Sequence, residues 1–144
     1  VELRENIKKF SKLWRGIKGW DNNLYLNTGI NEGQEFFGTI HSANNVQFTA
    51  LGDTINIAAR LSEFAKNGEI WTTKNLVSKL SLEQRNQYCF GVHNKTRTGN
   101  GFIRDSFARL SDLLTDNNPH YGQLSAIGSL PITEIKDRVT HENA

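Results

Sequence analysis

The sequence changes from a strand pattern to a helix pattern at one short break, Gly52-Asp53-Thr54. Before the break, Val46–Leu51 is an extended run typical of a β-strand. After it, Ile55–Ala65 contains strong helix formers with apolar residues spaced as a packed face. Within the break, Asp53 or Thr54 is suited to cap the helix start by accepting a backbone N–H bond. The stretch therefore predicts a strand, a tight turn and a helix in direct succession.

Shorter elements are predicted on both sides of this unit. Steps of three and four between apolar residues predict a helix from Leu3 to about Trp20. Two apolar runs, Leu24–Ile30 and Phe36–Ile40, flank a polar turn and predict a β-hairpin. Glu69–Thr72 reads as a short buried strand, followed by a short helix over Thr73–Leu80. This order predicts an α+β fold, with helices packed on one face of a mainly antiparallel sheet.

The C-terminal third is less regular. Tyr88–Thr98 and Phe102–Leu110 flank Asn100-Gly101, a dipeptide suited to a tight hairpin turn. The second arm also fits helical spacing, so a helical end remains an alternative there. Residues 117–144 are polar and rich in turn residues, and we expect them to form a loosely packed C-terminal tail.

Composition excludes several classes of protein. The net charge is only +2, and the 17 Lys and Arg residues are scattered, which argues against a nucleic-acid partner. No apolar run approaches the roughly 20 residues that cross a bilayer, so we expect no membrane segment. A single cysteine, Cys89, fits a reducing compartment, and we expect a cytoplasmic location. The sequence has no methionine, so we expect Val1 to be preceded by further sequence and the chain to be a fragment.

Asn56 and Arg60 are the candidate functional pair. They stand four residues apart in the expected helix, so both side chains leave one face about a turn apart. Arg60 carries a planar, permanently charged guanidinium that matches phosphate oxygens. Asn56 both donates and accepts hydrogen bonds, which suits a ribose or a water molecule. By spacing alone, the pair also fits the solvent face of an ordinary amphipathic helix.

The wider string gives this pair a context. Gly29-Ile30-Asn31-Glu32-Gly33, Gly38-Thr39-Ile40 and Phe48–Leu61 together resemble the signature of bacterial class III adenylate/guanylate cyclase catalytic domains. The resemblance extends from about Leu24 to Lys79. It implies that residues 1–116 are the C-terminal part of such a domain, with a ferredoxin-like cyclase fold.

The resemblance also implies roles for individual residues. Asn56 matches the asparagine that orients the ribose, and Arg60 matches the arginine that stabilises the α-phosphate during attack by the 3′-hydroxyl. Thr49 matches a base-specifying residue, and a threonine there resembles adenylate rather than guanylate cyclases. Lys95 and Arg97 lie near the late hairpin, where the family holds the triphosphate. The ordinary interpretations are a β-branched strand residue for Thr49 and solvated turn charges for Lys95 and Arg97.

Part of the family's active site has no counterpart here. The family binds two Mg²⁺ or Mn²⁺ ions through two aspartates upstream of the matching region, so we assign no metal ligand in this chain. The four histidines are too dispersed for a zinc cluster. The resemblance implies an adenylate cyclase that converts ATP to cyclic AMP and pyrophosphate, working as a homodimer or with a partner cyclase half. We expect the fragment alone to be inactive.

Two alternatives remain open. One is a cyclase-like regulatory or dimerisation domain without turnover. The other is a ferredoxin-like RNA-binding module, which the absence of a stacked-aromatic signature argues against.

Overall fold

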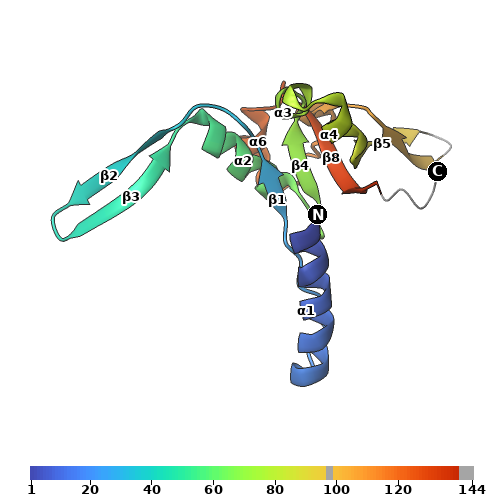
Figure 1. Cartoon of the computed structure of the whole chain (residues 1–144), viewed down its shortest axis with the longest axis horizontal. Coiled ribbons are helices and arrows are strands. Elements are labelled where there is room, and N and C mark those ends of the chain that lie inside the picture. Colours follow the sequence, from blue (N-terminus) through green and yellow to red (C-terminus); the bar gives the residue numbers. More distant parts are fainter. Residues whose placement is uncertain (97–98, 140–144) are drawn as a thin grey trace.

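The computed structural model of the chain describes residues 1–96 and 99–139. Its centre is a mixed sheet in which β1, β4, β8, β5 and β6 lie side by side in that order, and β7 also pairs with β8 (Figure 1). The bounds are Thr28–Ile30 for β1, Ile70–Thr73 for β4, Tyr88–Thr96 for β5, Gly99–Arg104 for β6, Ala108–Arg109 for β7 and Pro131–Arg138 for β8.

Only one pair of strands in this sheet is parallel. β1 runs parallel to β4, with Gly29 opposite Trp71, and every other pairing in the sheet is antiparallel. Helices and strands are mixed along the chain. The predicted fold class, α+β with a mainly antiparallel sheet, is confirmed.

The core lies between the sheet and three helices. α2 (Asp53–Phe64), α5 (Leu110–Leu113) and α6 (Tyr121–Ser125) surround it, and Phe64 of α2 packs edge-on against Trp71 of β4 with ring centroids 5.0 Å apart. The opposite side of β4, at Ile70, borders a pocket lined by Val77 of α3 (Lys74–Lys79). The buried members of the core cluster are Leu61, Phe64, Ala65, Trp71, Val92, Leu110, Leu124 and Ile132.

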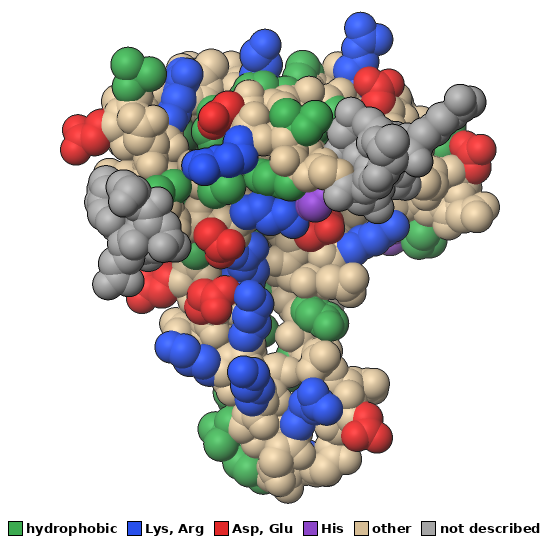
Figure 2. Space-filling model, turned by 90° about the vertical axis from the view of Figure 1, so that its right-hand side faces the viewer, with side chains coloured by type: hydrophobic (Ala, Val, Ile, Leu, Met, Phe, Trp, Pro, Cys, Tyr) green, Lys and Arg blue, Asp and Glu red, His purple; other side chains and the backbone are tan. Residues whose placement is uncertain are grey.

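The first helix forms as predicted but leaves most of its apolar stripe in water. α1 spans Glu2–Lys18 and extends away from the sheet (Figure 1). Leu3 is 62% exposed and Ile17 is 65% exposed. Figure 2 shows Lys and Arg side chains along the length of this helix. The apolar stripe of α1 therefore has little cover from the described residues.

The first predicted hairpin is wrong. Phe36–Ile40 belongs to β2 (Phe36–Ser42), which pairs with β3 (Asn45–Leu51) rather than with the run Leu24–Ile30. The latter contributes β1, which pairs with β4 some forty residues later. The β2–β3 hairpin projects from the main sheet as a separate two-stranded arm (Figure 1). The turn lies between Ser42 and Asn45.

The expected loose packing after Asp116 is also wrong. This part of the chain contains α6 and β8, and β8 lies between β4 and β5 in the middle of the sheet. Ile132, Thr133 and Glu134 are buried. Glu134 pairs with Lys136 at 2.7 Å, which offsets part of the cost of burying its carboxylate.

The remaining helix starts and turns follow the local sequence in some places and depart from it in others. A capping box formed by Ser81 and Gln84 lies at the start of α4 (Leu82–Asn86). Asn100-Gly101 does not form the hairpin turn, because both residues lie within β6, paired with Lys95 and Asn94 of β5. The second arm is helical only at its end, where α5 begins at Leu110.

Candidate functional site

The loop before the β2–β3 hairpin closes over the start of α2. The Glu35 carboxylate accepts a hydrogen bond from the Ile55 backbone N–H at 2.8 Å. The N-cap of α2 is Gly52, which has no side chain to cap with, so the predicted caps Asp53 and Thr54 are wrong. Glu35 instead caps the helix from a distance in sequence, and its negative charge lies at the positive end of the helix dipole.

Two glycines allow this close packing. A Cβ on Gly52 would lie 1.7 Å from Glu35 Oε2, in the space that the capping carboxylate occupies. A Cβ on Gly29 of β1 would lie 2.0 Å from the Ala58 backbone oxygen. α2 therefore lies directly against β1, and the helix that carries Asn56 and Arg60 is fixed to the edge of the sheet.

Asn56 and Arg60 both lie on α2, as predicted. Asn56 is exposed, and its side chain forms no hydrogen bond with any described residue. The Arg60 side chain is 34% exposed. One residue thus offers an unoccupied amide and the other a partly sheltered guanidinium on the same helix. This arrangement can bind an anionic ligand that also carries hydroxyl groups.

Arg60 is held by two side chains that sequence reasoning did not identify. Its Nη1 donates to Glu63 Oε2 at 2.9 Å and also to Gln123 Oε1. Glu63 stands three residues later on α2, so helical spacing could have revealed that pair. Gln123 lies on α6, far away in the sequence, and no local pattern indicates the contact.

Thr49 lies on β3, three residues before Gly52. It is half-buried and stands opposite Gly38 of β2, so the cross-strand neighbour leaves space beside it. The structure thus places Thr49 on the strand that leads directly into the helix of Asn56 and Arg60. No hydrogen bond of its hydroxyl to a described residue is present.

The backbone of Lys95 lies away from the pair on α2. The backbone of Lys95 lies on β5, which β8 separates from β4, whereas α2 lies at the β1 edge (Figure 1). Arg97 is outside the described residues. β8 and β4 therefore separate the backbone of Lys95 from the sheet edge where α2 lies.

The described residues do not fit a metal site. Across residues 1–96 and 99–139, no three His, Cys, Asp or Glu side chains lie close enough to hold an ion. In the same part of the chain, no helix is long and apolar enough to cross a bilayer.

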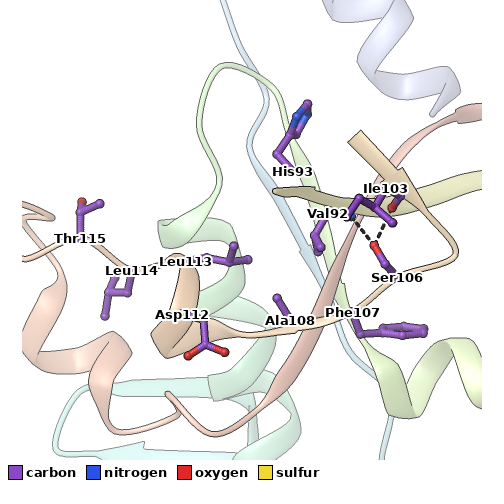
Figure 3. Close-up of a pocket in the computed structure, with 10 residues that line it drawn as sticks. All are labelled: Val92, His93, Ile103, Ser106, Phe107, Ala108, Asp112, Leu113, Leu114 and Thr115. Atoms are coloured by element: carbon purple, nitrogen blue, oxygen red, sulfur yellow. Dashed lines mark hydrogen bonds between the residues drawn. The ribbon is translucent and has the colours of Figure 1, made fainter. Parts of the chain in front are cut away.

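One cavity lies apart from the candidate pair. It has a volume of about 430 Å³ and lies between β5 and the segment around α5 (Figure 3). His93 and Asp112 are its titratable lining residues, and the Ser106 hydroxyl accepts from the Val92 N–H at 3.1 Å beside it. None of Thr49, Asn56 and Arg60 lines this cavity.

Comparison with known proteins identifies the chain's relationships. Relatives include the uncharacterised proteins Rv1318c of Mycobacterium tuberculosis and Mb1352c of Mycobacterium bovis, each 32% identical over 71 residues. The match covers 48% of this chain and 13% of each relative, so the chain corresponds to a small part of those proteins. Residues 2–101, more than half of the 144, match the family model described as "Adenylate and Guanylate cyclase catalytic domain". The chain belongs to the adenylate and guanylate cyclase catalytic domain family.

Proposed function

We propose that this chain forms one side of the active site of an adenylate cyclase, a lyase of cyclic-nucleotide signalling. In the reaction, the 3′-oxygen of ATP bonds to the α-phosphorus and loses its proton. The bond from the α-phosphorus to the oxygen that bridges it to the β-phosphate breaks, and pyrophosphate leaves. The products are cyclic AMP and pyrophosphate.

The main support for this proposal is the Arg60 guanidinium. A guanidinium aimed at the α-phosphate stabilises charge that develops as the new bond forms, and such a preorganised contact lowers the barrier directly. Its ion pair with Glu63 is partly exposed, with side-chain exposures of 34% and 32%. Pairs of this kind are worth about 0–1 kcal/mol, so a polyphosphate can compete with Glu63.

Four further residues complete the proposed substrate contacts. The free amide of Asn56, one turn before Arg60, would bond to the ribose. Thr49 would accept a hydrogen bond from the adenine amino group. By the family resemblance, Lys95 and Arg97 would hold the triphosphate.

Residues outside this sequence would supply the remainder of the site. The family uses divalent metal ions, and the described residues offer no ligand cluster for them. We therefore propose that aspartates elsewhere in the complete protein bind Mg²⁺ or Mn²⁺. The apolar stripe of α1 is exposed, which supports the proposal that other parts of the complete protein pack against it.

A homodimer is part of the proposal. The β2–β3 hairpin exposes Phe36, Phe37 and Phe48, and the last two rings stack 6.3 Å apart on one face. An exposed aromatic surface of this kind is typical of protein interfaces. Sedimentation of the complete protein at several concentrations tests the dimer.

A cytoplasmic location fits the one free cysteine, Cys89.

Two activity assays test the proposal. The 144-residue chain alone should form no cyclic AMP from ATP and Mg²⁺ or Mn²⁺, whereas the complete protein should form it. In the complete protein, Arg60→Ala should raise the barrier by about 2.7–4 kcal/mol, seen mainly as a lower kcat. Glu83→Ala, on exposed α4, is the matched control and should leave kcat unchanged. An unchanged rate in Arg60→Ala would remove Arg60 from the mechanism.

The choice of base needs a separate comparison. If Thr49 reads adenine, Thr49→Val should narrow the preference for ATP over GTP without unfolding the protein. Equal preference in the variant and the parent would make Thr49 a structural strand residue.

One observation favours a second function, a cyclase-like regulatory or dimerisation domain without turnover. The exposed aromatic hairpin offers a dimerisation surface that depends on none of the candidate substrate-binding residues. Under this alternative the complete protein would dimerise through the hairpin but make no cyclic nucleotide from ATP or GTP with either metal.

A further inference from the structure

The contact between Arg60 and Gln123 joins a residue within the family match to a residue beyond its end. Arg60 lies within residues 2–101, which match the cyclase family. Gln123 lies on α6, beyond the end of that match. The side-chain oxygen of Gln123 nevertheless accepts a hydrogen bond from Arg60 Nη1. The C-terminal segment therefore contacts the residue to which we assign phosphate stabilisation.

α6 is a fixed support rather than a loose neighbour. Leu124, next to Gln123, is 0% exposed and packs in the core cluster with Leu61 of α2. Asn118 is buried, and its side-chain oxygen accepts from the His120 N–H at 2.9 Å at the start of the turn. Figure 1 shows α6 beside α2. The backbone that carries Gln123 is thus anchored on both sides.

The chemistry of the amide suits a support for a cation. The Gln123 oxygen is neutral, so it orients Nη1 without cancelling the charge of Arg60. Because the guanidinium is planar and rigid, the two acceptors of Nη1, Glu63 and Gln123, together fix its plane and the directions of its other N–H bonds. Nε and Nη2 of Arg60 have no hydrogen-bond partner among the described residues. Those donors remain available for phosphate oxygens.

We propose that Gln123 is a positioning residue that sets the plane of the Arg60 guanidinium for the α-phosphate. The proposal rests on the proposed function, because it requires that Arg60 contact the phosphate. It extends the active site into a segment outside the family match. Glu63 holds the same nitrogen at 2.9 Å, so loss of Gln123 would leave Arg60 to the carboxylate alone.

The kinetic test is Gln123→Met in the complete protein, because methionine keeps the length of the side chain and removes the acceptor. We expect kcat to fall by about tenfold to a hundredfold with KM for ATP unchanged, the cost of misdirecting a catalytic group. In an Arg60→Ala background, the same change should have no further effect. Ser125→Ala, on the exposed side of α6, is the matched control and should retain the parental kcat.

A structural measurement on the 144-residue chain separates this proposal from the proposed function. Side-chain ¹⁵N NMR should show a resolved, slowly rotating Arg60 Nη resonance that Gln123→Met abolishes while the backbone spectrum is retained. If Gln123→Met abolishes that resonance but the complete protein makes no cyclic nucleotide, the proposed function fails. The hydrogen bond from Arg60 to Gln123 then has only a structural role, and the proposal that Gln123 positions Arg60 for catalysis is overturned as well. If the parent is active and Gln123→Met leaves kcat unchanged or raises it, positioning alone is overturned. An equal loss in Ser125→Ala would also overturn it, because the effect would then belong to the helix.

Discussion

Single residues at the junction of β1 and α2 decide whether the candidate site can form. Gly29 is the clearest example, because its Cα lies against the backbone of α2 and not against flexible side chains. A side chain there cannot be accommodated by a change of rotamer. The helix would have to move away from the sheet, and Asn56 and Arg60 would move with it.

We therefore predict that Gly29→Ala destabilises the chain by about 1–3 kcal/mol, the usual cost of overpacking a close contact. The reason is the 2.0 Å approach of the added Cβ to the Ala58 oxygen. Thermal unfolding followed by circular dichroism measures the change. Gly38→Ala, where a Cβ meets nothing within 4 Å, is the matched control and should unfold at the parental temperature or slightly above it. Equal stability of the two variants would contradict the packing argument.

The candidate residues could be predicted from the sequence, but not their supports. Asn56 and Arg60 share a helix, and helical spacing follows from local sequence. Glu63 obeys the same spacing and could have been found. Gln123 and Glu35 reach α2 from other elements, and such contacts depend on how the chain folds back on itself.

Helix α2 depends on a loop for its first turn. Its N-cap residue, Gly52, provides no side-chain acceptor, and the Glu35 carboxylate takes that place. The loop between β1 and β2 also bonds to the helix through Asn31, whose amide donates to the Thr54 oxygen at 3.3 Å. The helix and the loop therefore stabilise each other.

We predict that Glu35→Ala lowers the free energy of unfolding by about 1 kcal/mol, the typical value of a helix cap. Glu35→Gln should cost less, because it keeps an acceptor for the Ile55 N–H and loses only the charge. Urea denaturation measures both changes. Gln34→Ala alters the exposed neighbouring side chain and is the control. A loss as large in Gln34→Ala would assign the effect to the loop as a whole.

Strand partners were harder to predict than the elements themselves. α1, α2 and the capping box at Ser81 follow from residues close together in sequence. β1 and β4 are parallel and far apart in the sequence, so no turn dipeptide between them indicates that they pair. β2 instead pairs with β3, across the short turn between Ser42 and Asn45.

For the chain as a whole, the decisive feature is the position of β8. A polar composition concealed this strand, because Thr133 and Glu134 are buried in the sheet although their residue types favour the surface. β8 joins β4 to β5, so the two parts of the sheet meet only through it. The segment expected to be a loosely packed tail therefore contains a strand in the middle of the sheet.

We predict that a chain cut after Asp116 does not fold cooperatively. Removing β8 would leave the facing edges of β4 and β5 without hydrogen-bond partners and would open the core at Ile132. Near-ultraviolet circular dichroism and thermal melting test this outcome. Shortening the β2–β3 hairpin, which lies outside this sheet, is the control and should leave a cooperative transition. A sharp transition in the truncated chain would contradict the prediction.

The placement of β8 also bears on how the chain is made. A ribosome synthesises β1, β4 and β5 before Pro131–Arg138, the strand that joins them. During that interval the nascent chain carries two unpaired strand edges, which are the surfaces that chaperones protect from aggregation. Completion of this sheet, and with it the support of Arg60 by α6, is therefore a late event in the synthesis of this part of the protein.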